Sequence, residues 1–272
     1  MAKPQAVAKP AAQAVVPAET ANALVLVQDQ LPDYLREQQE QTRGNENVGT
    51  DDIVIPRLEL IQALSPAVKD GDPGFIPEAR PGMLMNSVTK QLYGKEVMVV
   101  PVYYTKQWLV WKKRKDKDGK ALEGGFFGAY NSSMEAQERC DAKGGEAGNI
   151  EVLDTPQHLC LLLNPETGEA DEVMMSMPRT KSKVSRQWNS MVRLAGGDRF
   201  ARVYKITSVL EKKTAGDYYN FSVAQAGFPS KPLYEKAEKL WESVNAGVRN
   251  VVMDASGFGG DEGHTVEEGA EM

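Results

Sequence analysis

Hydrophobic residues gather in a few stretches whose spacing predicts mostly β-strands. The longest stretch, Lys95 to Lys113, reads KEVMVVPVYYTKQWLVWKK and is β-branched or aromatic almost throughout. This composition favours a strand, and one far longer than the ~5 to 6 residues of an average strand. Pro101 has no amide hydrogen to donate, so it indicates an edge position or a bulge within that strand.

Two hairpins are predicted farther along the chain. His158–Leu163 and Glu172–Met177 are apolar runs on either side of the turn-forming segment 164–169, which reads NPETGE. A turn signal between two apolar runs is typical of a hairpin. Ala201–Leu210 and Tyr218–Ala226 form a second pair of strands around a Thr-Ala-Gly-Asp turn.

Between these two predicted hairpins, the apolar residues have the spacing of a helix and not that of a strand. Within Lys181–Ala195 one helical face is apolar, and it carries Val184, Trp188, Met191, Val192 and Ala195. Gly196 and Gly197 end this helix, and Trp188 is expected in the core. Leu233–Val248 has the same kind of spacing and predicts a second helix.

The order long strand, strand, strand, helix, strand, strand indicates a mainly β protein of the α+β class. An OB-fold has five strands in a partly open barrel. Its helix often lies between the third and fourth strands, and its first strand is long enough to serve both halves. We therefore predict a five-stranded OB-fold-like barrel with an interstrand helix and insertions. Another small β-barrel with the same element order is left open.

Composition divides the chain into four parts. Residues 1–50 are rich in Ala, Pro and Gln and are expected to form a flexible arm. Residues 51–230 form the predicted OB-fold-like domain, and residues 231–250 the helix packed on it. Residues 251–272 carry six acidic residues and no Lys or Arg, which predicts a disordered acidic tail.

The net charge of −6 at first argues against a nucleic-acid partner, but its distribution reverses that argument. The acidic tail alone accounts for −6. The segment from Lys95 to Lys120 has a net charge of +5, and the segment from Arg179 to Lys213 has +8. Both segments belong to the predicted barrel, so a basic surface on it is expected.

Several classes of protein are excluded by the sequence. No apolar run approaches the ~18 to 20 residues of a membrane span, and no signal-peptide pattern opens the chain. Cys140 and Cys160 are expected to be reduced in a cytoplasmic protein. His158 and His264 are the only histidines, which supplies a zinc site poorly. We expect no cofactor and no metal.

Motifs for catalysis are also missing from the sequence. No phosphate-binding loop and no GxSxG nucleophile motif is present. The acidic pairs Asp51–Asp52, Asp116–Asp118 and Asp171–Glu172 could in principle hold magnesium, but each lies in a turn-like stretch. A non-enzymatic protein is expected, with a magnesium-dependent nucleic-acid enzyme as one alternative.

Aromatic and basic residues alternate in the two positive segments. Single-stranded nucleic acid requires this combination, because cations track the phosphates and aromatic rings stack on unpaired bases. The candidate binding residues are Tyr104, Lys106, Trp108, Trp111, Lys112, Lys113, Arg114, Phe126, Phe127, Arg179, Lys181, Lys183, Arg186, Arg202, Tyr204 and Lys205.

Within the long strand, Tyr104, Lys106, Trp108 and Lys112 share one face if no bulge intervenes after Pro101. Such a mixed face suits a stacking platform, although a core Trp108 with lysines at the rim fits as well.

The acidic tail completes the pattern. Its acidic residues include Asp261, Glu262, Glu267, Glu268 and Glu271. We expect this segment to fold over a basic groove in competition with nucleic acid, or to recruit replication or recombination proteins. A purely solubilising tail is the alternative.

The chain resembles the single-stranded DNA-binding proteins that tailed bacteriophages encode. The resemblance rests on Ile55–Gly71, Lys95–Arg114 and Pro178–Ala226, together with the arm and the acidic tail. The chain differs from those proteins at Glu271 and Met272, because their acidic tails commonly end in an aromatic residue. The resemblance implies an OB-type barrel that coats single strands during phage replication or recombination in the bacterial host cytoplasm.

The expected function is therefore sequence-tolerant binding of single-stranded DNA, with RNA and a homo-oligomeric state left open. The principal alternative is a phage interaction or structural protein that uses the barrel to bind a protein partner.

Overall fold

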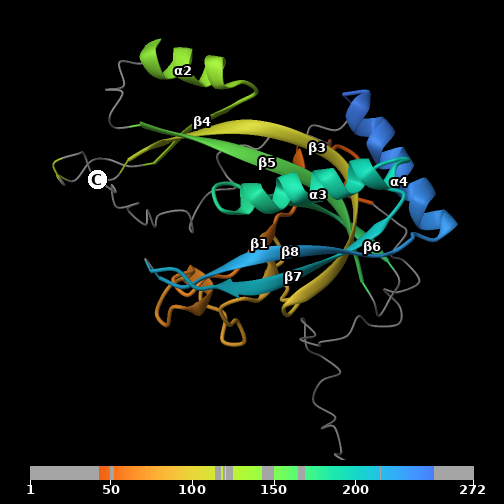
Figure 1. Cartoon of the computed structure of the whole chain (residues 1–272), viewed down its shortest axis with the longest axis horizontal. Coiled ribbons are helices and arrows are strands. Elements are labelled where there is room, and N and C mark those ends of the chain that lie inside the picture. The colour runs from red at the N-terminus through yellow and green to blue at the C-terminus, as the bar shows by residue number, and fades with distance from the viewer. Residues whose placement is uncertain are drawn as a thin grey trace, which may run out of the picture. The chain divides into compact units, whose positions relative to one another are not determined.

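The computed structural model of the chain is shown in Figure 1. It describes residues 43–49, 52–113, 118, 120, 125–142, 150–164, 169–214 and 216–247. Two units make up the chain, Met1–Val48 and Gly49–Met272. Only residues 43–48 of the first unit are described, and they form turns. Arg114, most of the predicted arm and the whole acidic tail lie outside the described residues.

A six-stranded sheet in the second unit is organised around the long strand β3 (Glu96–Lys112). Its strand order is β6-β5-β3-β7-β8, and β4 pairs with β3 outside this path. The other strands are β4 (Gly125–Tyr130), β5 (Ile150–Leu163), β6 (Ala170–Ser176), β7 (Val203–Glu211) and β8 (Tyr218–Gly227). The mainly β character and the α+β class are confirmed.

Strand β3 serves two halves of the sheet. It pairs with β5 along most of its length, with β7 near Glu96–Val99, and with β4 near Trp108–Lys112. The register shifts between Pro101 and Tyr103, as the proline indicates. This bulge precedes Tyr104, so the alternation of Tyr104, Lys106 and Trp108 on one face is kept.

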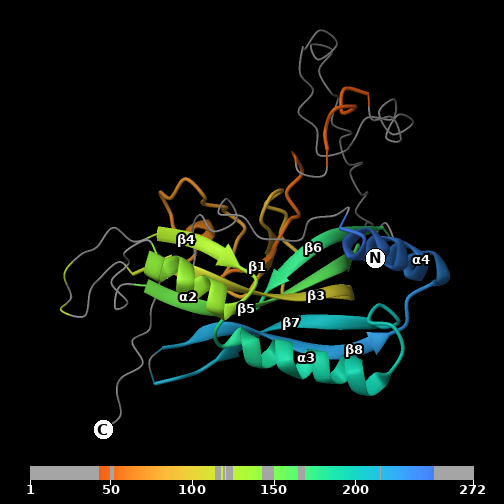
Figure 2. The ribbon, with the colours of Figure 1, turned by 90° about the horizontal axis from the view of Figure 1, so that it is seen from above.

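Three α-helices lie on the strands: α2 (Ser133–Ala142), α3 (Lys181–Ala195) and α4 (Lys231–Asn245). The bounds of α3 are those the sequence predicts, and Gly196 ends it with φ 69°. Figure 2 shows α3 and α4 on opposite sides of the sheet, with α3 beside β8. A 3-10 turn, η3, spans Pro66–Val68.

Each of these two helices covers its own core. The α3 core lies between α3 and the sheet and includes Trp188, which is 0% exposed, with Tyr204, Ile206 and Phe221 of β7 and β8. The α4 core lies on the other side and joins Leu161 and Met174 to Ala237, Leu240 and Val244 of α4. Both sides of the central strands are therefore buried, which explains their near-continuous apolar sequence.

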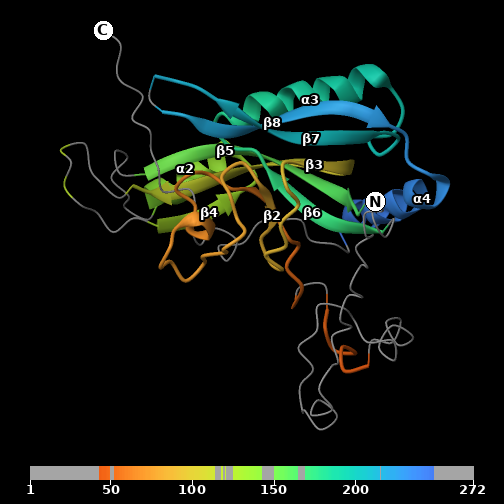
Figure 3. The same ribbon diagram turned by 90° about the horizontal axis from the view of Figure 1, so that it is seen from below.

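A closed barrel is not present, because β6 and β8 do not pair with each other in the described ladder. A third segment lies between them instead: β1 (Leu58–Leu60), which pairs with β2 (Leu84–Asn86). At its start the carbonyl of Pro56 accepts the amide of Met174 in β6 at 2.8 Å. Figure 3 shows the sheet and the β2 loop region from below.

At the other end of this segment the side chain of Gln62 makes the hydrogen bonds that a neighbouring strand would make. Gln62 Oε1 accepts the amide of Tyr219 in β8 at 2.9 Å, and Gln62 Nε2 donates to the Tyr219 carbonyl at 3.0 Å. The primary amide thus satisfies both backbone groups of one edge residue. Residues 56–62 consequently connect the two outer strands, β6 and β8, where the predicted barrel would have paired them directly.

Replacing Gln62 by Ala is expected to destabilise the protein by about 1–3 kcal/mol, because the N–H and C=O of Tyr219 are left without their partner. Urea unfolding followed by circular dichroism measures the change. Gln91→Ala is the matched control, since Gln91 is exposed and its side chain makes no hydrogen bond among the described residues. Equal unfolding midpoints for the two variants would contradict this role of Gln62.

Candidate nucleic-acid interface

A cleft of about 500 Å³ lies between the first half of α3 and the β7–β8 hairpin. Four basic residues line it: Arg179, Lys183, Arg186 and Lys213. Its apolar wall is formed by Val184, Val209 and Phe221. Glu211 is the one acidic residue among the described lining residues, so the cleft is strongly positive.

The Glu211 carboxylate accepts hydrogen bonds from two neutral side chains and lies near the charges of Lys213 and Lys183. Tyr218 Oη donates a short hydrogen bond to Glu211 Oε2, and Asn220 Nδ2 donates to Oε1 at 2.7 Å. These two bonds, Tyr218 first, lower the pKa of Glu211. The carboxylate therefore fixes the position of the Tyr218 ring at the side of the cleft.

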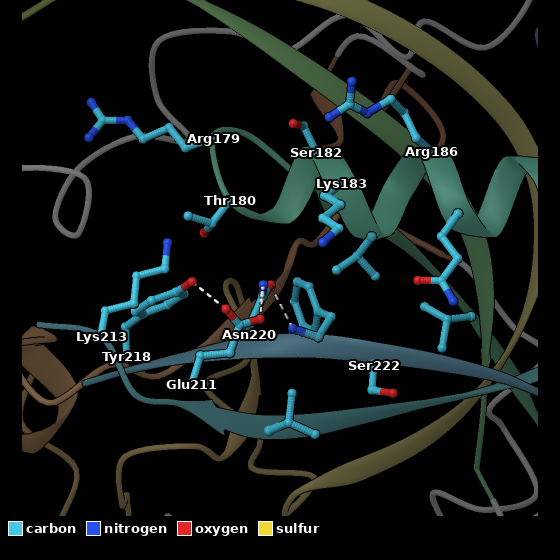
Figure 4. Close-up of a pocket in the computed structure, with 15 residues that line it drawn as sticks. Arg179, Thr180, Ser182, Lys183, Arg186, Glu211, Lys213, Tyr218, Asn220 and Ser222 are labelled. Carbon is cyan, nitrogen blue, oxygen red and sulfur yellow. Dashed lines mark hydrogen bonds between the residues drawn. The ribbon is translucent and has the colours of Figure 1, made fainter. Parts of the chain in front are cut away.

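The arrangement of the lysines is shown in Figure 4. Lys183 extends from α3 toward β8, and Lys213 rises from the hairpin beside Tyr218. Lys213 Nζ lies 5.0 Å from the centre of the Tyr218 ring. Two cations and a half-buried aromatic ring thus share one side of the cleft, a combination that suits a phosphate next to a stacked base.

The two arginines of the cleft rim point elsewhere. In Figure 4 the guanidinium groups of Arg179 and Arg186 are directed away from the strands. Arg179 adopts a left-handed backbone conformation, φ 53°, and its Nη2 contacts both carboxylate oxygens of Glu151 in β5 at 2.9 and 3.0 Å. Arg186 is exposed and has no ion pair within the described residues.

A buried polar cluster holds α3 in place above the sheet. Trp188 of α3 stacks on His158 of β5 with ring centres 4.5 Å apart. Arg199 Nη2 donates to His158 Nδ1 at 2.8 Å and to Asn189 Oδ1 at 2.9 Å. Since Nδ1 accepts, the ring proton lies on Nε2, which donates to Ser185 Oγ at 2.7 Å.

Burial determines the charge states in this cluster. Burial, followed by the nearby Arg199 charge, holds the pKa of His158 well below its usual value. The imidazole is therefore neutral. Burial also raises the pKa of the neighbouring Cys160 thiol to about 12. Cys160 is buried and forms no disulfide among the described residues.

The predicted residues of β3 and β4 form a separate group at the far end of the sheet. Lys106 pairs with Asp154 at 2.6 Å and lies over the Trp108 ring, 5.3 Å from its centre. Trp108 and Phe127 are partly buried in a small cluster beneath α2. The described structure thus gives Trp108 a packing role, with a partly exposed side chain.

Two aromatic contacts define the tip of that group. Trp111 and Phe126 meet edge to face at 5.3 Å, and Lys112 Nζ lies 5.9 Å from the Phe127 ring centre. Lys113 is exposed. Tyr104, in contrast, belongs to the buried cluster, because it contacts His158 edge to face and the Arg199 guanidinium at 5.4 Å.

Three further candidates lie outside the cleft. Tyr204 is 1% exposed and packs on Trp188 in the α3 core, so it offers no open stacking surface. Lys205 pairs with Glu96 at 3.5 Å. Arg202 donates to the carbonyls of Ala195 and Gly196, both at 2.7 Å, and thereby caps the end of α3.

Lys181 lies at the cleft's edge, 5.6 Å from the centre of the Phe221 ring. Of the predicted residues, the structure therefore brings Arg179, Lys183 and Arg186 together in one cleft. Lys213 lines the cleft as well, although the sequence analysis did not single it out as a binding residue. The Lys212-Lys213 pair before a Gly-containing turn was the available signal, because a tight turn places it beside Tyr218.

Neither a cluster of metal ligands nor a helix suited to cross a membrane occurs among the described residues. In this part of the chain no three His, Cys, Asp or Glu side chains come together as metal ligands. None of its helices has both the length and the hydropathy that crossing a membrane requires.

A known family covers most of the chain. The family model described as Pam3 phage gp34-like protein matches residues 20–250. The chain belongs to this family. No curated protein and no solved structure matches it. Membership of the gp34-like family agrees with the expected phage origin, and the match includes all the residues of the cleft.

Because His158 is neutral in the folded state, we predict that the stability of this gp34-like protein depends on pH. Its folded-state pKa is lowered, whereas the unfolded chain titrates near 6.5. Below about pH 6.5 the unfolded state binds a proton that the folded state does not, so the free energy of unfolding falls by up to about 1.4 kcal/mol per pH unit from this group. In a His264→Gln variant, NMR is expected to show the remaining imidazole neutral and protonated at Nε2 at pH values well below 6.5. Titration with a midpoint near 6.5 would contradict the prediction.

Proposed function

We propose that this protein binds single-stranded DNA without sequence preference, through the cleft between α3 and the β7–β8 hairpin. The observation that carries the proposal is the grouping of Lys183, Lys213 and Tyr218 in a cleft whose described lining has four basic residues and one acidic residue, Glu211. Cations would contact phosphates, and the tyrosine ring would stack on a base. Both contacts are independent of base identity.

The cleft chemistry favours single strands over duplex DNA. A base in a duplex is already stacked and paired, so an aromatic ring reaches its face only after unpairing. Recognition of phosphates and base faces specifies an unpaired strand, and does not select DNA over RNA.

The arrangement of strands supports an OB-type relationship. Strand β3 is long and pairs with both β5 and β7. Helix α3 lies between the third and the fourth strand when the strands are taken in the chain order β3, β5, β6, β7 and β8. We propose that the sheet is an OB-type barrel whose last pairing is replaced by residues 56–62. OB-folds commonly bind oligonucleotides on a strand face and its flanking loops.

The proposed role is to coat and protect unpaired strands during phage replication or recombination in the host cytoplasm. Recruitment of other replication proteins would be the task of the acidic residues between 254 and 271. This role requires no chemistry on the DNA.

Neutralising the two cleft lysines tests the proposal. The double variant Lys183→Gln/Lys213→Gln is expected to bind a labelled oligothymidylate more weakly. The slope of log K against log salt should become shallower by about 0.7 for each phosphate that the variant no longer neutralises. Fluorescence anisotropy at several salt concentrations measures both quantities, with oligouridylate and a duplex for comparison.

Lys239→Gln is the control, because Lys239 is exposed on α4 and the substitution removes one lysine charge at a distant site. It should leave the slope unchanged. Absence of binding by the unmodified protein at low salt, or identical slopes for all variants, would refute the proposed function.

A further inference from the structure

An exposed aromatic side chain follows directly on β8, at the end opposite to the cleft. Phe228 is 73% exposed, the highest exposure of any aromatic side chain among the described residues. The Arg202 guanidinium lies 5.9 Å from the centre of its ring. Leu194 at the end of α3 is 88% exposed and precedes Ala195, whose carbonyl Arg202 binds at 2.7 Å.

The position of Arg202 is fixed by the end of α3. Its two Nη groups donate to the last carbonyls of the helix at 2.7 Å each. No carboxylate lies within ion-pair distance of Arg202 among the described residues. The positive charge beside Phe228 is therefore held in place by carbonyl groups at the negative end of the helix dipole, and no described carboxylate neutralises it.

The same two elements, α3 and β8, connect this end to the cleft. Near their beginnings Lys181 lies over Phe221, and at their ends Arg202 joins the last turn of α3 to Phe228. Figures 1 and 2 both show α3 alongside β8. Strand β8 is 10 residues long, which corresponds to roughly 30 Å. An aromatic ring with an adjacent cation thus stands at each end of one continuous α3–β8 surface.

We propose that Phe228 and Arg202 form a second stacking and phosphate-contact site for the same DNA strand as it leaves the cleft. This inference rests on the proposed function and adds the path of the strand along α3 and β8, from Tyr218 and Lys213 to Phe228 and Arg202. Phe228 stacks on a base, and Arg202 contacts the adjoining phosphate. An apolar ring of this exposure beside a cation that has no carboxylate partner among the described residues matches the chemistry of a nucleotide better than that of an apolar peptide.

The path makes the contribution of Phe228 depend on DNA length. An oligothymidylate of about 4 nucleotides fills the cleft only, whereas one of about 12 nucleotides reaches both ends; both lengths are within the range known for single OB-folds. In the full-length protein, Phe228→Ala is expected to weaken binding of the longer strand about fivefold or more and to leave the shorter one unchanged. Phe228→Trp should restore the affinity, since it keeps an aromatic face.

Two further measurements distinguish stacking from other effects. Phe228→Ala removes no charge, so the salt slope of binding should stay the same while the affinity falls. Phe75→Ala is the control, because Phe75 is also an exposed phenylalanine (38%) but lies in the loop after η3. This control should bind both lengths like the unmodified protein.

The outcomes separate the inference from the proposed function. If the unmodified protein binds DNA and Phe228→Ala binds the longer strand equally well, the second site is overturned and the cleft proposal stands. The same holds if Phe228→Ala alters only the molecular mass in sedimentation, which would assign Phe228 to a protein contact. If the unmodified protein does not bind single strands, both proposals fail.

Discussion

The half-buried guanidinium of Arg199 makes the interactions on which the arrangement of α3 depends. It joins β5 through His158 Nδ1, α3 through Asn189 and the Trp188 ring, and β3 through the face of Tyr104. A cation removed from water without a carboxylate is costly, and burial lowers the pKa of Arg199 accordingly. Two neutral acceptors and two aromatic faces offset that cost, but only when all three elements are in place. Formation of this cluster is thus coupled to the seating of the helix.

A helix held in this way leaves its other side available. Trp188 and Ser185 of α3 are committed to the buried cluster, and Lys183, two residues before Ser185, consequently faces the β7–β8 hairpin. Glu211 and Asn220 then orient Tyr218 on the facing strands. The cleft is therefore a result of helix packing and not of an independently folded loop. Preorganisation of this type reduces the entropic cost of binding.

Much of this organisation could be predicted from the sequence, because it follows from periodic patterns. Helical spacing defined the bounds of α3 and the burial of Trp188, and β-branched residues with Pro101 defined the long strand and its bulge. The predicted start of β5 at His158 was wrong, because its polar first half pairs with a half-exposed part of β3. The prediction of a closed barrel was wrong for another reason. Gln62 binds Tyr219 across 157 positions of sequence, and a single long-range contact has no periodicity that pattern analysis could detect.

Charge distribution explains why the net charge of −6 is a poor guide to this molecule's surface. At physiological ionic strength charges interact over about 8 Å, so a strand in the cleft would respond to Lys183 and Lys213 and hardly to distant acids. Several predicted cations, such as Lys106, Arg179 and Lys205, are paired with Asp154, Glu151 and Glu96. The two segments with net charges of +5 and +8 therefore contribute only a small number of positive charges that are available to a ligand. Lys183, Arg186 and Arg202 form no ion pair among the described residues and lie on α3 or beside its end, and this makes the helix the element most suited to contact a polyanion.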